Sequence, residues 1–203
     1  MSIMPQEVIG FLKTNQIWIG FSFCFLISNS LFCLGFEGNN QRFLSLKAAY
    51  LSHFSSYVKG PQKLLPNQKT RYCLWEIQPT LGPAFSRAIA SSPEWSKKIE
   101  VIFPKSIEEI QKCHIAYFGK EYFQKHLLDQ TSWNAVPILT ISEDVEFLKQ
   151  GGVLRFFVER NRLRFEINLK KGKSLKLWFS SQLLALSRIF SMELPPTKEN
   201  VQN

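Results

Sequence analysis

Histidine, cysteine and acidic side chains could carry catalysis or hold a metal ion, and in this chain they are scattered. His53, His114 and His126 form no His-x-x-x-His or Glu-x-x-His pair, the spacings that place two metal ligands on one helix face. Cys113 and His114 are adjacent, so on a strand they point to opposite faces and cannot easily share one metal. We therefore predict no metal site and no cofactor.

The acidic residues indicate no reaction either. Asp129 and Asp144 do not end a predicted strand, and Glu76 stands alone at the end of one. The chain has neither a glycine-rich phosphate motif nor a Gly-x-Ser-x-Gly nucleophile elbow. Because a catalytic site without any local signature is uncommon, we predict that the protein is not an enzyme. A hydrolase with a dispersed site is a weaker alternative.

An apolar stretch without charge runs from Ile17 to Leu34, with Lys13 before it and Glu37 after it. A basic flank followed by an apolar run is typical of a secretory signal, and the length also suffices for an uncleaved membrane anchor. A buried core helix is the third interpretation. We predict that residues 1–35 are a signal peptide or N-terminal membrane anchor, which places the folded part in an oxidising compartment.

The basic residues gather near the C-terminus. The formal net charge is +9, and residues 155–188 contain nine basic and two acidic residues. Such a stripe can bind nucleic acid, an acidic protein or anionic lipid, or it can simply be a solvated face. Export argues against nucleic acid, so we expect no nucleic-acid partner. The candidate partner-facing residues are Arg155, Arg160, Arg162, Lys170, Lys171 and Lys173.

The hydrophobic pattern predicts the elements that position these residues. Strands are predicted at residues 71–77, 98–104, 113–119 and 135–142, followed by a hairpin of residues 153–159 and 162–169. Helices are predicted at residues 43–59, 83–90, 121–130, 143–150 and 180–190, and a Ser106-x-x-Glu109 capping box predicts a short one after residue 106. Residues 170–174 are expected to be a basic turn, residues 175–178 a short strand, and residues 192–203 a flexible tail.

Strands that alternate with helices predict one α/β domain over residues 43–191, a Rossmann-like three-layer sandwich. Its sheet is expected to be mainly parallel, in flavodoxin-like order, with the C-terminal hairpin antiparallel at one edge. That order makes the strands of Cys73 and Cys113 neighbours, close enough for a disulfide; two free buried thiols are the alternative. A small-ligand pocket would lie beyond the carboxyl ends of the strands, near residues 77–82 and 119–121.

Residues 138–189 resemble the C-terminal part of the YfiR-like family. The residues that carry this resemblance are Gly151, Gly152, Arg164, Phe165, Glu166, Ile167, Asn168, Ser180 and Ser181. The runs LKAAYLSHFSSYVK (46–59) and CHIAYF (113–118) also resemble the family, so that the likeness spans about residues 43–190. The chain departs from the family where the opening helix ends, at Val58-Lys59-Gly60-Pro61, and in having one cysteine pair after the leader.

The resemblance implies a function that the residues alone do not show. It implies an exported, periplasmic α/β protein that restrains a membrane-bound diguanylate cyclase by binding its periplasmic sensor domain, with a link to redox or envelope stress. A periplasmic small-ligand-binding protein that feeds a membrane sensor or transporter is the alternative. Glu166 could then face the partner, but we expect it to pair with Arg155, Arg162 or Arg164 across the hairpin. The oligomeric state stays open, a homodimer included.

Overall fold

The computed structural model describes residues 40–61, 68–76, 80–126 and 133–191. The chain divides into two compact units, Met1–Arg42 and Phe43–Asn203, and every strand among the described residues belongs to the second. The predicted leader, residues 1–35, and the predicted tail, residues 192–203, lie outside the described residues. Within the described ranges, no helix is both long and apolar enough to cross a membrane.

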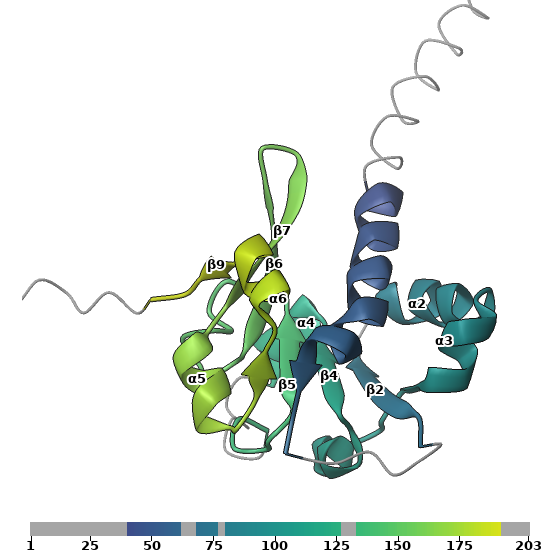
Figure 1. Cartoon of the computed structure of the whole chain (residues 1–203), viewed down its shortest axis with the longest axis horizontal. Coiled ribbons are helices and arrows are strands. Elements are labelled where there is room, and N and C mark those ends of the chain that lie inside the picture. Colours follow the sequence, from purple (N-terminus) through teal and green to yellow (C-terminus); the bar gives the residue numbers. More distant parts are fainter. Residues whose placement is uncertain (1–39, 62–67, 77–79, 127–132, 192–203) are drawn as a thin grey trace, which may run out of the picture. The chain divides into compact units, whose positions relative to one another are not determined.

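Seven strands form one sheet in the order β3-β2-β4-β5-β6-β7-β9 (Figure 1). The strands are β2 (Thr70–Trp75), β3 (Ile99–Ile102), β4 (Ile115–Phe118), β5 (Leu139–Ser142), β6 (Leu154–Glu159), β7 (Arg162–Ile167) and β9 (Arg188–Ile189). The strands from β3 to β6 in this order pair in parallel with their neighbours. β6 and β7 pair antiparallel, and β9 runs parallel to β7. The predicted fold class is confirmed, and the strand of Cys73 does lie beside the strand that follows Cys113.

Helices cover both faces of the sheet and bury two separate hydrophobic clusters. They are the opening helix (residues 40–57), α2 (Leu81–Ala90), α3 (Pro93–Lys98), the 3₁₀ helix η1 (Ile107–Lys112), α4 (Lys120–Lys125), α5 (Leu169–Ser174) and α6 (Ser181–Leu186). On β2, Tyr72 and Leu74 face the larger cluster, which includes the opening helix, α2 and α6. Cys73 and Trp75 face the smaller cluster with η1 and α4. Successive side chains of β2 thus pack alternately into the two hydrophobic clusters, as expected of an inner strand of a parallel sheet.

The hairpin turn follows directly from its residues. Arg160 and Asn161 connect β6 to β7 and have φ values of 49° and 58°. A two-residue turn in which both residues have positive φ matches the right-handed twist of the two strands it connects. Asn tolerates this conformation well. The turn keeps Phe156 opposite Phe165, so that both rings face the larger cluster.

Several elements differ from the prediction. The opening helix ends at Tyr57, because β1 (Val58–Lys59) pairs antiparallel with β8 (Trp178–Phe179). The predicted helix of residues 143–150 is absent: residues 145–150 form turns, since the Asp144 carboxylate accepts a hydrogen bond from the backbone N–H of Glu146 and so competes with helix formation. The Ser106 side chain makes no helix-capping hydrogen bond.

Other differences lie in the C-terminal third. Residues 170–174 belong to α5 and are not a turn, because the Asn168 side chain accepts a hydrogen bond from the N–H of Lys171 and caps that helix. The predicted helix to Phe190 stops at Leu186, after which β9 pairs beside β7. The short helix α3 was not predicted; Ser92 caps it, and Pro93 starts it.

Candidate functional site

A polar cluster lies at the carboxyl ends of β4 and β5, near the place where the strand order reverses between β2 and β4. Tyr117 donates a hydrogen bond to Glu143 Oε1 at 2.7 Å, and Lys47 Nζ lies 2.7 Å from Glu143 Oε2. Burial, together with the adjacent carboxylate, raises the pKa of the Tyr117 hydroxyl well above its ordinary value of 10. Tyr117 therefore stays protonated at neutral pH and acts as a hydrogen-bond donor.

Glu76 directly follows β2, and its side chain caps the N-terminus of helix α2. Its carboxylate accepts hydrogen bonds from the N–H groups of Leu81, at 3.0 Å, and Gly82, at 2.8 Å. A helix N-terminus at this edge of an α/β sheet is a ready site for a phosphate or carboxylate of a ligand. Here the carboxylate of the chain itself takes that position, and the crevice between Glu76 and Glu143 has a volume of about 200 Å³.

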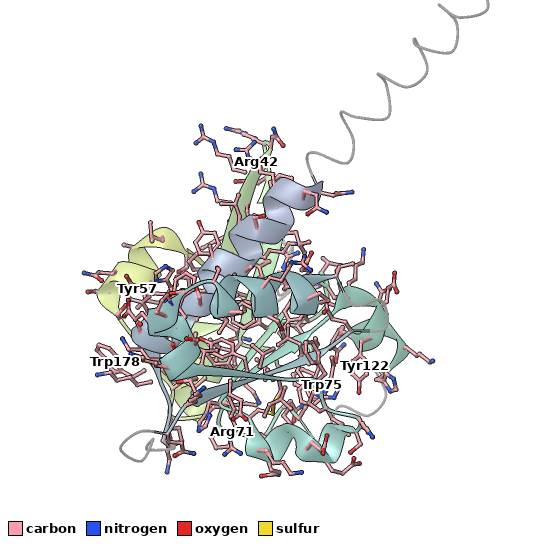
Figure 2. All side chains as sticks on the ribbon, turned by 90° about the vertical axis from the view of Figure 1, so that its right-hand side faces the viewer. Arg42, Tyr57, Arg71, Trp75, Tyr122 and Trp178 are labelled. Carbon is pink, nitrogen blue, oxygen red and sulfur yellow. A yellow bond between two sulfur atoms is a disulfide. The ribbon has the colours of Figure 1, made fainter. Side chains whose placement is uncertain are left out.

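A larger crevice lies beside it, on the face of the smaller cluster. It has a volume of about 500 Å³, and its lining includes Trp75, Phe103, Lys105, Tyr122 and His126. The Trp75 ring stacks on Phe118 with 5.1 Å between the ring centroids, and Figure 2 places Trp75 and Tyr122 in the same part of the molecule. The Trp75 indole N–H is buried and has no hydrogen-bond acceptor among the described residues. Residues 77–79, part of the predicted ligand pocket, lie outside those residues.

The three histidines lie apart from one another. The His53 ring packs edge-on against Trp95 with 5.4 Å between centroids, and the His126 ring stacks on Tyr122. His114 Nδ1 accepts a hydrogen bond from the backbone N–H of Arg71 at 2.9 Å. In the part of the chain that the structure describes, no group of three His, Cys, Asp or Glu side chains could hold a metal ion.

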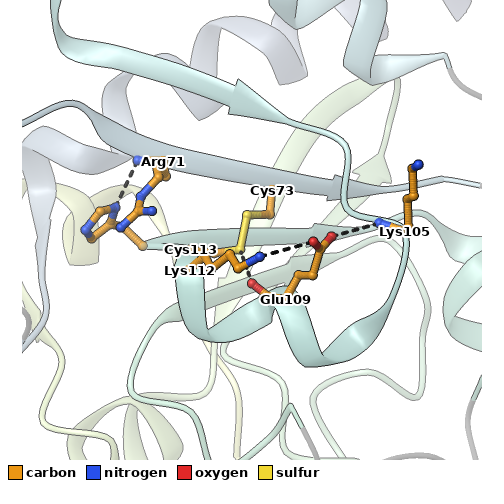
Figure 3. The surroundings of a disulfide bond; sticks show 7 residues. Arg71, Cys73, Lys105, Glu109, Lys112 and Cys113 are labelled. Carbon is orange, nitrogen blue, oxygen red and sulfur yellow. Dashed lines mark hydrogen bonds and ion pairs between the residues drawn. A yellow bond between two sulfur atoms is a disulfide. The ribbon is translucent and has the colours of Figure 1, made fainter.

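Cys73 and Cys113 form a disulfide with their Cα atoms 5.8 Å apart (Figure 3). Both cysteines are almost fully buried in the smaller cluster. Cys113 follows η1, so the bridge ties the middle of β2 to the connection that enters β4. Glu109 stabilises the same connection. Its carboxylate accepts a hydrogen bond from the backbone N–H of Lys105 and lies 3.2 Å from Lys112 Nζ.

His114 and Arg71 extend the β2–β4 pairing by one step next to the disulfide. The backbone N–H of His114 donates to the carbonyl of Arg71 at 2.9 Å, in addition to the ring contact described above. Burial and the nearby Arg71 charge lower the pKa of His114 below 6.5. The geometry requires Nδ1 to be an unprotonated acceptor, which agrees with that direction.

The family model described as YfiR/HmsC-like (DUF4154) matches residues 44–188. The chain belongs to the YfiR/HmsC-like family. Proteins of this family are periplasmic regulators of diguanylate cyclase and are regulators rather than enzymes. The resemblance found in the sequence is thereby confirmed.

Other comparisons are more distant. No curated protein matches the chain. An ABC domain from Streptococcus pneumoniae, solved in complex with L-Trp, has 12% identity and a TM-score of 0.42 over 63% of this chain and 57% of that one. A conserved domain protein from Vibrio cholerae has 10% identity and a TM-score of 0.44 over 62% and 56%. The YfiR/HmsC-like chain thus spans less than two thirds of either protein.

The signature residues of this YfiR/HmsC-like chain mostly shape the C-terminal part of the fold. Gly151 has a φ of 93°, which only glycine adopts readily, and Gly152 packs so closely that a Cβ there would meet the Phe147 ring. The remaining signature residues divide between buried strand positions of β7 (Phe165, Glu166, Ile167), the exposed Arg164, helix caps (Asn168, Ser180) and the start of α6 (Ser181). None of them lines the two crevices at the carboxyl edge.

Glu166 pairs with Arg155, as expected across the hairpin. Arg155 Nε donates to Glu166 Oε1 at 2.5 Å, and both side chains are largely buried. Because its guanidinium is bound to Glu166, Arg155 does not act as a partner-facing residue. The other predicted partner-facing residues divide into Arg160 and Arg162 on the hairpin, and Lys170, Lys171 and Lys173 on α5. The hairpin turn and α5 lie at different ends of the unit in Figure 1, so these residues do not form one continuous stripe.

Sequence reasoning missed the cluster of Lys47, Tyr117 and Glu143. These residues come from the opening helix, β4 and the turn after β5, and no short motif links them. The position of Glu143 directly after the apolar run LTIS was the available signal for this cluster. Asp144 does not end a strand, as predicted; it lies two residues beyond β5, is buried and accepts a hydrogen bond from Gln124 at 2.7 Å.

Proposed function

We propose that the protein is an exported regulator that binds the periplasmic domain of a membrane-bound diguanylate cyclase and holds the enzyme in its inactive state. The single observation that carries this proposal is the family match over residues 44–188. It supports a regulator of diguanylate cyclase; the export of this chain and its particular partner belong to the proposal.

The disulfide supports export. Disulfides persist in oxidising compartments and are rare in the reducing cell interior. Cys73–Cys113 lies in the core of the folded unit and connects two neighbouring strands, which is the arrangement of a structural bridge. The apolar stretch from Ile17 to Leu34 supplies a means of export.

Repression follows from differential binding. The regulator shifts the cyclase only as far as it binds the inactive form more tightly than the active form. Moving a cyclase from about 1% to about 99% inactive requires roughly 10⁴-fold preference for the inactive form. Reduction of Cys73–Cys113 would weaken repression by loosening the strands that the bridge connects, which links the cyclase to the redox state of the envelope.

The test measures cyclic-di-GMP in cells of the native organism. Deleting the gene should raise cyclic-di-GMP, and the intact chain should restore the low level. A variant without residues 1–35 should fail to restore it, whereas the same variant with an unrelated cleavable signal should succeed. Equal repression by the variant without a leader would refute an action from outside the membrane, and an unchanged nucleotide level would refute cyclase control.

A small-ligand-binding function is the second candidate, and the crevice at Trp75 is the observation that favours it. A buried indole N–H without an acceptor beside an aromatic crevice suits a planar ligand that has a hydrogen-bond acceptor. A ligand screen by thermal shift would test it, with Trp75→Phe as the variant. A ligand that stabilises the wild type and the Trp75→Phe variant equally does not bind the indole N–H.

A further inference from the structure

The β6–β7 hairpin extends beyond the body of the sheet and ends in a basic tip. Figure 1 shows its turn standing clear of the neighbouring elements. We define the hairpin tip as Val158, Arg160, Asn161, Arg162 and Arg164. All five are exposed; Val158, which is 52% exposed, lies opposite Leu163 and so points to the other face of the hairpin from Arg162 and Arg164.

The hairpin tip carries more positive than negative charge. Glu159 is the acid beside it; its carboxylate is held by Arg188 at 2.6 Å, and the charges of Arg188, Arg160 and Arg164 together lower its pKa. The other acid of the hairpin, Glu166, is bound by Arg155. Arg160, Arg162 and Arg164 form no ion pair among the described residues, so three guanidinium groups remain available for an external anion.

The hairpin tip lies at the end of the unit where the chain enters it. The opening helix packs beside the hairpin base, with 5.5 Å between the ring centroids of Tyr50 and Phe165. The N-terminal end of this helix and the hairpin tip point the same way in both Figure 1 and Figure 2. The apolar stretch ends at Leu34, nine residues before Phe43, which an extended chain spans in about 30 Å.

We propose that the hairpin tip binds the phosphate groups of anionic phospholipids at the outer surface of the membrane that holds the regulated protein. The inference rests on the proposed function, because it requires the domain to work beside that membrane. Guanidinium groups bind phosphate through paired hydrogen bonds, so a tip with three exposed arginines suits a surface of anionic headgroups. The short sequence distance between the apolar stretch and the folded unit favours lipid over an acidic protein surface as the binding partner.

The expected preference is large enough to measure. Three arginines near an anionic surface give roughly 100-fold stronger association with anionic than with neutral lipid at low salt. Screening should remove most of it at high salt, where the Debye length falls to about 3 Å. An attraction between charges behaves in this way, whereas burial of Val158 alone would not.

The test uses the chain as cells deliver it, with or without its leader, and an excess of lipid nanodiscs. One set of discs contains phosphatidylcholine alone, and the other also contains phosphatidylglycerol. Hydrogen–deuterium exchange is followed in peptides that cover residues 156–165. Slower exchange of these peptides with phosphatidylglycerol only, reversed by high salt, is the expected result. Equal exchange on the two kinds of disc overturns the proposal.

Two triple variants separate a local contact from the effect of net charge. Arg160→Gln, Arg162→Gln and Arg164→Gln together should abolish the protection. Lys170→Gln, Lys171→Gln and Lys173→Gln together remove the same charge from α5 and should keep it. Equal loss in both variants would refute a specific tip contact. Protection by the cyclase periplasmic domain in place of lipid would assign the tip to a protein, and intact repression without lipid protection would refute this inference alone.

Discussion

Reduction of Cys73–Cys113 removes a cross-link while both side chains stay in place, so its effect on stability can be worked from the chain. The two cysteines are 40 residues apart in sequence. Closing a loop of that length lowers the entropy of the unfolded chain enough to stabilise the fold by roughly 4 kcal/mol. Since domains of this size are stable by about 5–15 kcal/mol in total, the bridge supplies a large part of that stability.

The expected shift in melting temperature follows. For a domain of this length, 1 kcal/mol corresponds to roughly 2–4 °C, so reduction should lower the melting temperature by roughly 8–16 °C. The assay is thermal unfolding followed by circular dichroism, with and without reductant. Alkylation and mass spectrometry would count the thiols before each scan.

A double variant supplies the control. Cys73→Ala with Cys113→Ala removes the bridge and leaves Cys24 and Cys33 as the only cysteines. Its melting temperature should be low and should not respond to reductant. A response of the double variant would assign the effect to the leader cysteines. A shift below about 3 °C in the wild type would refute the loop-entropy reasoning.

Three further predictions concern single residues. Glu143→Gln should lower the free energy of unfolding by about 1–2 kcal/mol in urea titrations, because its ion pair is partly buried; Lys98→Gln breaks an exposed pair and should cost less than about 0.5 kcal/mol. Because folding lowers the pKa of His114, its contribution to stability is complete above the unfolded value of about 6.5 and is lost as pH falls through the folded pKa. His114→Asn should therefore flatten the stability profile below pH about 6.5. Gly152→Ala places a methyl group 2.2 Å from the buried Phe147 ring and should destabilise by about 1–3 kcal/mol, and a neutral result would show that this ring moves freely.

The regular strands and the disulfide could be predicted because each depends on a local pattern. The apolar runs around Cys73 and Ile115 define neighbouring strands of a parallel sheet, and the two cysteines then come within reach of each other. The strand ends at residues 142, 159 and 162 were predicted correctly, but most other ends were placed up to four residues too far out, since apolar residues such as Phe103 continue past the last ladder hydrogen bond.

Pairings between distant residues could not be predicted. β1 has two residues, and its pairing of Val58 with Phe179 leaves no periodic trace in the sequence. The contact of Lys47 with Glu143 likewise joins an opening helix to a turn 96 residues later. The same holds for residues 143–150, where a helical pattern gave way to hydrogen bonds that the side chain of Asp144 makes locally.

The pairing of β1 with β8 bears on the order in which the protein assembles. The opening helix leads straight into β1, whose partner strand emerges from the ribosome only after residues 178–179 have been made. Contacts between remote segments form slowly because a long loop must close first. The fold therefore stays incomplete until residues 178–179 have been made, a delay that suits the proposed export, because a secretion channel passes only unfolded polypeptides.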